Sequence, residues 1–250
     1  MDTGLSRSVK EKRILYYSLI FLALFTFLTI TPLRNEASAE EREVTLDKAH
    51  IDPTDLASLQ RGAEIFMNEC SGCHSLKYIR YSTMAKDIGI VDSKGQVLDQ
   101  AVKANLMFVG DKLVDTIQSS MTKEQGVNWF GVAPPDLSLV ARLRGVDWLY
   151  TYLRSFYLDK KRPWGVNNHL FPDVAMPDAL FNLRARLLLE PEGQKKVDRL
   201  MLDLVNFLHY AGEPTKLVRQ GIGKWVVLFL GVFFVFAYLL KREYWKDVRL

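Results

Sequence analysis

The sequence is poor in the two residue types that build disulfide frameworks and zinc sites. It has two cysteines and four histidines among 250 residues. The cysteines stand three apart in CSGCH, which excludes a network of disulfides as the support of the fold. A tetrahedral zinc site needs two more Cys or His ligands, and the other three histidines are scattered (His50, His169 and His209). A thioredoxin-like redox pair needs a βαβ pattern, and strand patterns are nearly missing.

The sequence also lacks a strong charge of either sign. Its formal net charge is +4, and no basic patch points to nucleic acid as a partner. There are no internal repeats and no low-complexity tracts, and 48% apolar with 25% charged residues is typical of folded protein. The basic excess lies near the two ends of the chain. Such charges commonly flank membrane segments.

A first long apolar run occupies residues 14–31 and contains no charge. Basic residues precede it, and the small-residue sequence Ala37-Ser38-Ala39 follows. A positive start, an apolar middle and an A-x-A site predict a signal peptide over residues 1–39. Because the apolar part is long for that role, an uncleaved N-terminal membrane anchor is the alternative.

A second apolar run, residues 225–240, is followed by Lys241 and Arg242. Aromatic residues bracket it, as in the belts of membrane helices. We therefore predict a transmembrane helix over 221–241 rather than a buried core helix. Basic residues stay in the cytoplasm, which makes 242–250 a cytoplasmic tail and places the domain 40–220 in the periplasm, outside the cytoplasmic (inner) membrane.

The exported domain reads as mainly helical. Residues 52–69 predict a helix that leads into Cys70, with Asp52 as its cap. Asp147 is expected to cap a second helix through VDWLYTYLRSFY, and residues 195–214 show clean helical spacing with a polar link, 213–221, after them. The segment 87–136 has no sustained period and carries seven acids against four lysines. A solvated surface is the plain interpretation of that segment, and a docking face for a basic partner is the alternative.

The motif Cys-x-x-Cys-His at residues 70–74 is the attachment signature of a c-type haem. Two thiols on one turn reach the two vinyl groups of one porphyrin, and the next residue offers its imidazole to the iron. We therefore predict Cys70 and Cys73 as thioether tethers and His74 as the proximal iron ligand. Export agrees with this, because c-type haem is joined to protein outside the cytoplasm.

The second axial position decides between an electron carrier and a site that binds small ligands. Met67 and Met201 lie on apolar helical faces and are expected in the core. Met176 stands in FPDVAMPDAL, where the following proline keeps it out of a helix and on a rigid loop. It is the best candidate for the sixth ligand, against a packing role. The other candidates are Met84, Met107 and Met121.

The segment APPDLS, residues 133–138, predicts a stiff extended wall, because two adjacent prolines restrict the backbone. Arg142 and Arg144 follow in ARLRG. The propionates of a buried haem need cationic or hydrogen-bonding partners, and these arginines are candidates. A solvent-exposed arginine pair is an equally plain interpretation.

With CSGCHSLKYIRY, APPDLSLVARLRG and AMP in this order before a final membrane helix, the chain resembles cytochrome c1, the haem-c subunit of the bacterial cytochrome bc1 complex (ubiquinol–cytochrome c reductase). The resemblance covers roughly residues 45–245. It implies a mainly α fold, a class I cytochrome c-like haem domain with a single C-terminal transmembrane helix. The linker between LYTYLRSFY and AMP is shorter than in mitochondrial members, as expected for a bacterial enzyme.

The resemblance also implies roles for individual residues. It implies Met176 as the second iron ligand and Arg144 as the partner of a haem propionate, with Arg142 peripheral. It implies haem contacts for Pro135, Trp148, Leu153 and Val174. Trp148 stands where many relatives have tyrosine, which puts a hydroxyl role at that position in doubt.

The implied function is electron transfer without bond-making chemistry by this chain. One covalent haem c would accept an electron from the Rieske iron–sulfur protein and pass it to a soluble or membrane-bound cytochrome c. Cytochrome b, membrane lipid and a dimeric complex are the further expected partners. Two alternatives remain at this point: a membrane-anchored monohaem cytochrome c serving a terminal oxidase, and a haem-c peroxidase or ligand sensor.

Overall fold

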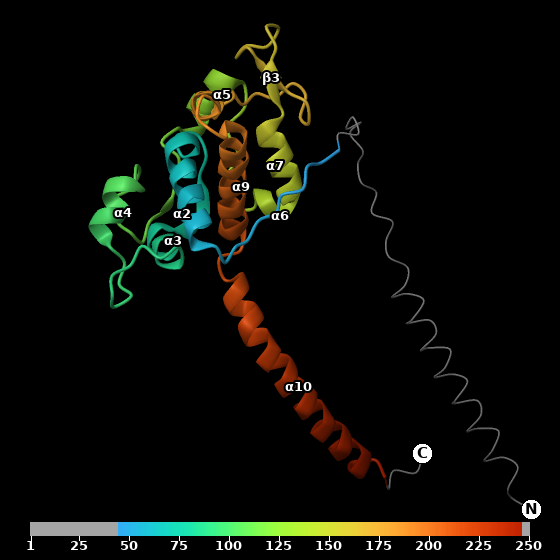
Figure 1. The fold of residues 1–250 in the computed structure, drawn as a ribbon. Coiled ribbons are helices and arrows are strands. Elements are labelled where there is room, and N and C mark those ends of the chain that lie inside the picture. The colour runs from blue at the N-terminus through green and yellow to red at the C-terminus, as the bar shows by residue number, and fades with distance from the viewer. Residues whose placement is uncertain (1–44, 247–250) are drawn as a thin grey trace, which may run out of the picture. The chain divides into compact units, whose positions relative to one another are not determined.

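The computed structural model describes residues 45–246. The predicted signal peptide and the last residues of the predicted tail lie outside this range. The described part is mainly helical, as predicted, and its elements follow the order below (Figure 1). They are α2 (Leu56–Ile65), the π-helical turn η1 (Phe66–Cys70), β1 (Leu76–Arg80), α3 (Tyr81–Asp87), α4 (Asp99–Asn105), β2 (Thr116–Ile117), α5 (Lys123–Phe130), α6 (Val140–Arg144), α7 (Val146–Arg154), β3 (Phe156–Leu158), β4 (Val166–Asn168), α8 (Phe181–Leu188), α9 (Gly193–Gly212) and α10 (Lys216–Tyr244).

The core forms where α2 packs against α9 (Figure 1). Phe66 and Phe207 are fully buried there, with ring centroids 5.8 Å apart. Burial of side chains of this size contributes roughly 1.5–3 kcal/mol each relative to exposure. At the edge of the crossing, Arg61 Nε donates to Asp203 Oδ2 at 2.6 Å, so the carboxylate of the buried Asp203 is paired. These contacts fix the helix that leads into the Cys70 turn.

Two predicted helix caps are wrong by a few residues. The first helix begins at Leu56, and its cap is Asp55, whose carboxylate accepts the Ser58 N–H at 3.1 Å. Asp52 instead accepts from Thr54 in a local turn. Asp147 lies inside the first turn of α7, after Gly145, and its carboxylate accepts from Ala49 N at 2.9 Å and pairs with Lys48. The Asp52 carboxylate accepts from a local donor, Thr54, whereas the Asp147 carboxylate accepts from Ala49 and Lys48, distant donors that helical spacing does not reveal.

The strands are short and form two separate two-stranded antiparallel sheets. β1 pairs with β2, and β3 pairs with β4. The predicted helix through residue 157 ends at Arg154, because Phe156 and Tyr157 pair with Asn168 and Asn167. The β3–β4 hairpin is the yellow projection in Figure 1. Its role is to connect α7 to the loop that carries Met176.

The acidic segment 87–136 holds α4, β2 and α5. Some of its carboxylates serve local turns: Asp92 accepts from Lys94 and Gln96, and Asp115 accepts from Asp111 and Lys112. Hydrogen bonds to these backbone N–H groups lower the pKa of Asp115. A docking role for this surface stays a prediction.

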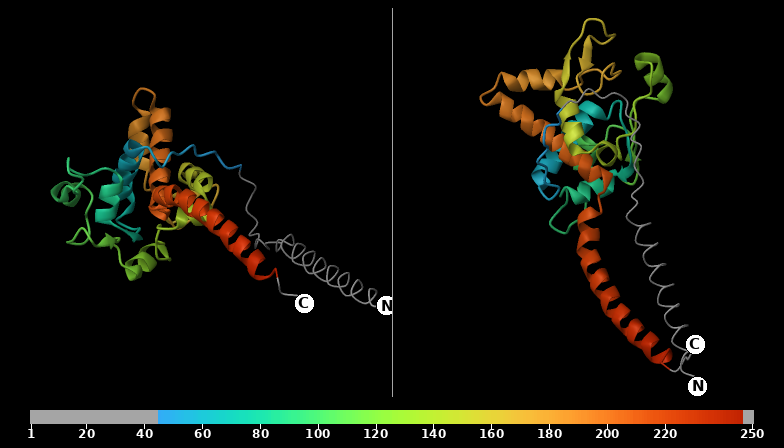
Figure 2. Two further views of the ribbon diagram at one scale, coloured as in Figure 1. Left: turned by 90° about the horizontal axis from the view of Figure 1, so that it is seen from below. Right: turned by 90° about the vertical axis from the view of Figure 1, so that its right-hand side faces the viewer.

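The last helix, α10, is long and apolar. Its stretch Val218–Tyr244 has 27 residues, a composition suited to a membrane span, and no buried side chains. At 1.5 Å per residue it is about 40 Å long, more than the roughly 30 Å of a hydrocarbon core. The helix begins at Lys216, inside the polar segment 213–221 that the sequence suggested as a link. Figure 2 shows it leaving the end of α9.

The α2–α9 crossing gives a testable prediction at Gly62. An added Cβ at this position would overlap the backbone carbonyl oxygen of Asp203 and come within 2.6 Å of Phe207 Cβ. Backbone cannot move aside cheaply, so we expect Gly62→Ala to reduce the free energy of unfolding by about 2–4 kcal/mol. The check is the thermal midpoint of the purified chain.

A matched control is Gly231→Ala in α10, where an added Cβ meets nothing within 4 Å. We expect this control to leave the midpoint of the helical domain unchanged. Equal effects of the two variants would contradict the assigned close approach.

Candidate functional site

One cavity of about 650 Å³ is lined by all nine predicted site residues. Its wall is formed by the Cys70 turn, the proline segment, α6, α7, the loop around Met176, and two buried leucines of α9. The nine are Cys70, Cys73, His74, Pro135, Arg144, Trp148, Leu153, Val174 and Met176. Of the nine, Cys70 and Met176 lie 106 positions apart in the sequence, so the fold alone brings them to one place.

The Cys-x-x-Cys-His motif forms a single tight turn after η1. Ser71 N donates to Phe66 O at 2.9 Å, a five-residue span that marks the π-helical turn. His74 N and Cys73 N both donate to Cys70 O, at 2.8 and 3.0 Å. The turn therefore presents two sulfurs and one imidazole from five consecutive residues.

The buried ring of His74 is held by the proline segment. His74 Nδ1 lies 2.7 Å from the carbonyl oxygen of Pro135, which makes Nδ1 the protonated nitrogen and leaves Nε2 as an acceptor. Burial lowers the pKa of His74, although the Pro135 hydrogen bond and the charge of Asp136 oppose that effect. A neutral imidazole with Nε2 free is the form that binds iron.

The proline segment is itself fastened to the chain that follows His74. Leu137 N donates to Ser75 O at 2.9 Å, and Lys77 N donates to an Asp136 carboxylate oxygen at 3.1 Å. Ser138, which is buried, accepts from Tyr78 N at 3.2 Å. Asp136 and Ser138 thus connect two segments, and they keep Pro135 beside His74.

The loop of Met176 is fixed on both sides by arginines. Before it, Arg162 donates to a carboxylate oxygen of Asp173 at 2.9 Å and to the Asp173 backbone oxygen at 2.7 Å. After it, Arg184 of α8 pairs with the buried carboxylate of Asp178. Asp173 has a φ of 60°, the left-handed region that Asn and Asp tolerate best among non-glycine residues. A loop fixed in this way keeps the Met176 thioether in the cavity.

Arg144 and Trp148 lie together on the cavity wall. The guanidinium carbon of Arg144 is 5.0 Å from the centre of the Trp148 ring, a cation–π contact. Trp148 Nε1 is buried and has no hydrogen-bond partner among the described residues. A buried N–H without a partner costs about 1–3 kcal/mol. Both donors therefore suit an acidic or acceptor group of a cofactor.

The thiols do not resemble a redox-active or zinc-binding pair. Burial raises the pKa of the Cys70 thiol to about 12, and burial also raises the pKa of Cys73. Thiols that attack disulfides have lowered pKa values. Within residues 45–246, no group of three or more His, Cys, Asp or Glu side chains is placed to hold a metal ion. Neither observation favours the redox or zinc alternatives weighed for CSGCH.

The residues present fit a haem c. The cavity is mainly apolar, and it is lined by the two cysteines, an imidazole with one free nitrogen, and a thioether. The unpartnered Trp148 N–H and the Arg144 guanidinium supply donors for propionate oxygens. Met67 and Met201 are buried in the core and do not line the cavity, as expected.

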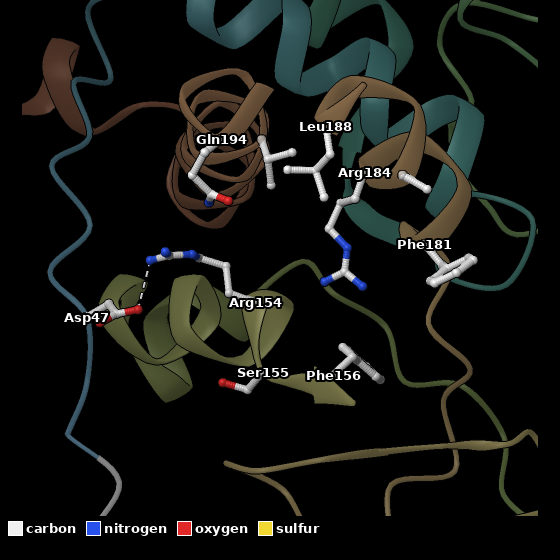
Figure 3. A pocket seen from close by; sticks show the side chains of 10 residues that line it. Asp47, Arg154, Ser155, Phe156, Phe181, Arg184, Leu188 and Gln194 are labelled. Carbon is white, nitrogen blue, oxygen red and sulfur yellow. Dashed lines mark hydrogen bonds and ion pairs between the residues drawn. The ribbon is translucent and has the colours of Figure 1, made fainter. Parts of the chain in front are cut away.

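A second cavity, of about 420 Å³, lies among α7, α8 and α9 (Figure 3). Figure 3 shows Arg154 reaching across to Asp47, a 2.8 Å ion pair, and Arg184 entering from α8. Arg154 also lies 3.3 Å from Asp198, and Arg184 pairs with Asp178. Both positive charges are therefore already neutralised by protein carboxylates. The ion pairs beside this cavity connect Asp47 to α7 and the Met176 loop to α8.

Three residues that the sequence did not single out contribute to the site. Tyr152 lines the cavity, while Arg162 and Arg184 fix the loop of Met176. The helical spacing placed Tyr152 on the buried face of its helix, four residues after Trp148, and that spacing was the available signal. The sequence held no such signal for Arg162 and Arg184, because their partners are known only from the fold.

The comparisons with known proteins support the cytochrome c1 family, and one similar relative carries a different name. The profile of the Cytochrome C1 family matches residues 47–248. The chain is 48% identical over 249 residues to cytochrome c1 of Allochromatium vinosum, covering 91% of this chain and 98% of that one. It is 40% identical over 236 residues to the ammonia monooxygenase gamma subunit of Nitrosomonas europaea, covering 90% and 97%. It is also 28% identical over 230 residues to cytochrome c1 of Rhodospirillum rubrum, covering 78% and 83%.

Proposed function

This chain belongs to the cytochrome c1 family, and from that premise we propose how its residues hold haem and serve electron transfer. It is the haem-carrying electron-transfer subunit of the bc1 complex, and it carries one covalently bound haem c. It is thus a component of an oxidoreductase that contains cytochrome b. Family membership favours this function over an oxidase-linked cytochrome or a peroxidase.

The residue assignments are our proposal, and the shared cavity is the observation that carries them. Cys70 and Cys73 hold the haem covalently, and His74 binds the iron through Nε2 because Pro135 engages Nδ1. Met176, which lines the same cavity, would supply the second iron ligand through its thioether. Bound haem c supplies a one-electron iron couple, and methionine–histidine ligation raises its potential.

The remaining wall residues exclude water and balance charge. Pro135, Leu153 and Val174 are apolar parts of the wall, and a dry wall limits the reorganisation that accompanies a change of charge. We propose that Arg144 and the Trp148 N–H face the propionates, whose negative charge needs partners in a low-dielectric site.

The cavity mouth suits exchange of electrons with other proteins. Tyr78 and Leu143 line it and are 73% and 81% exposed. We propose that the Rieske iron–sulfur protein is the electron donor and a soluble or membrane-bound cytochrome c the acceptor. Exposed apolar side chains at a site edge are suited to brief contacts of this kind.

We further propose the arrangement of the chain in the membrane. The chain is a membrane-anchored subunit with a candidate transmembrane helix at its C-terminal end. Lys241 and Arg242 in the last turn of α10 favour a cytoplasmic C-terminus, which puts the haem domain in the periplasm of a bacterium. The segments 1–39, 40–220, 221–241 and 242–250 then have the roles predicted from the sequence, and a dimeric complex remains part of the proposal.

Purification of the native complex tests this function. The tagged chain, extracted from its own membranes in mild detergent, should bring down cytochrome b and a Rieske protein, and added quinol should reduce its haem c. Isolation with a terminal oxidase, or with subunits of the assembly named for the Nitrosomonas relative, would contradict the proposal. Rapid carbon monoxide binding to the reduced native protein would favour the peroxidase or sensor alternative.

A further inference from the structure

Tyr152 of α7 points its hydroxyl at the sulfur of Met176. The distance from Tyr152 Oη to Met176 Sδ is 3.4 Å, within hydrogen-bond range for a sulfur acceptor. The two residues come from different segments, one from a helix and one from the loop held by Arg162 and Arg184. The contact is therefore a product of the tertiary fold.

The ring of Tyr152 has little freedom to turn away from the sulfur. It stacks on Trp148 with ring centroids 5.0 Å apart and an interplanar angle of 9°. Phe156 meets it edge-on, at 5.3 Å and 72°. Asn168 Nδ2 donates to the Tyr152 backbone oxygen at 2.8 Å, which fixes the end of the helix turn. When the ring is packed in this way, its hydroxyl oxygen stays beside the Met176 sulfur, because only the hydroxyl proton can rotate.

The chemistry of a thioether allows one sulfur to serve two partners. The sulfur has two lone pairs, of which an iron ligand uses one, and the second can accept a hydrogen bond. Donation by a hydroxyl draws electron density from the sulfur and makes it a weaker electron donor. A weaker donor stabilises the oxidised iron less, which favours the reduced form.

We propose that Tyr152 is a positioning residue for the sixth ligand: its hydroxyl donates to the sulfur of Met176, holds the thioether in the cavity, and raises the haem potential. This inference rests on the proposed role of Met176 as an iron ligand. Tyr152 is distinct from Trp148, which occupies the position where the family resemblance places a haem contact. The hydroxyl acts through Met176 rather than on the iron itself.

The test compares Tyr152→Phe with the matched control Tyr150→Phe on the same helix. Tyr150 packs under the guanidinium of Arg154, at 4.7 Å, and does not line the cavity. For Tyr152→Phe, the ratio of reduced to oxidised haem at a fixed potential should fall about two- to fivefold, since a net hydrogen bond is worth roughly 0.5–1.5 kcal/mol and sulfur is a weak acceptor. At 59 mV per tenfold for one electron, this is a decrease of roughly 20–40 mV.

Two further readouts separate this role from simple packing. The methionine–iron charge-transfer band of the oxidised form should shift in Tyr152→Phe, and carbon monoxide should bind the reduced form faster. Tyr150→Phe should leave the band, the binding rate and the potential unchanged. An unchanged potential and band in Tyr152→Phe, or equal changes in both variants, would overturn the inference.

A measurement on the unmodified chain keeps the inference testable if Tyr152→Phe fails to assemble. Proton NMR of the reduced native protein should show a cross-peak between the Tyr152 hydroxyl proton and the Met176 methyl group. Ring-proton contacts without this cross-peak would overturn the inference while leaving Met176 as ligand. A native protein without any methionine–iron band would instead refute the proposed ligand.

Discussion

Met176→Leu should open the sixth position of the haem iron and lower its midpoint potential by on the order of 100 mV, within the range of about 0.8 V over which axial ligands move haem potentials. Leucine has a similar volume but offers no lone pair, so the iron loses its thioether donor while the loop keeps its shape. Exchanges of this kind usually cost less than about 1.5 kcal/mol of stability. The variant should therefore remain folded and retain covalent haem.

The structure explains why Met176→Leu should change the ligation of the iron without disturbing the loop. The Met176 loop is held by Arg162 and Arg184 through contacts that do not involve the methionine side chain. The measurements are a redox titration of the purified complex and carbon monoxide binding to its reduced form. Loss of the methionine–iron band should accompany both changes.

Met201→Leu is the matched control for this prediction. Met201 is fully buried in α9 and does not line the cavity, so its replacement changes packing without changing ligation. We expect an unaltered spectrum and potential for this control. An unaltered spectrum for Met176→Leu itself would retire Met176 as the sixth ligand.

Local chemistry explains which features could be predicted from the sequence. The Cys70 turn is a contiguous motif whose spacing alone specifies attachment of a porphyrin, and the structure places it in a cavity with Met176. The proline after Met176 excluded a helix at that position, and the loop there is irregular. The long apolar faces predicted the helices that became α2, α7 and α9.

Features that depend on distant partners could not be predicted. Asp147 looked like a helix cap, but its carboxylate bonds a segment 98 residues earlier in the chain, at Ala49. Tyr152 looked like a core residue, since periodicity identifies the buried face of a helix but not what lies against it. The π-helical turn before Ser71 also follows from no periodicity or capping residue in the sequence. For Asp147 and Tyr152 a tertiary contact decided the outcome.

The supports of the two proposed iron ligands differ in kind, and this bears on the redox role. His74 is held through one carbonyl, on a segment fastened to residues 75–78 by a backbone bond and by the side chains of Asp136 and Ser138. Met176 is held through charged pairs on its loop and the hydroxyl of Tyr152. Both arrangements keep a ligand in place whichever charge the iron carries. An electron carrier needs this property, because movement of ligands between oxidation states slows transfer.

Cys70→Ser should leave at most one thioether bond to the haem, and the Cys70→Ser/Cys73→Ser double variant should leave none. Serine keeps the shape of the turn, whose hydrogen bonds run from His74 N and Cys73 N to the backbone oxygen of residue 70. A hydroxyl, unlike a thiol, does not form a stable link to the vinyl groups. Covalent haem per polypeptide should therefore fall well below the native level in the single variant.

The measurements are haem staining after denaturing electrophoresis and the position of the α-band of the pyridine haemochrome, which reports how many vinyl groups remain unsaturated. Ser71→Ala is the matched control. Its hydroxyl donates to Met67 O at 2.6 Å, so its loss weakens the same turn without removing a sulfur. If Ser71→Ala keeps a normal amount of covalent haem while Cys70→Ser has less, the loss is due to the missing sulfur. Cys70 and Cys73 are the only cysteines in the sequence, and both line the cavity, so no third thiol could replace Cys70. Native haem staining and a native α-band in Cys70→Ser would therefore contradict Cys70 as a tether.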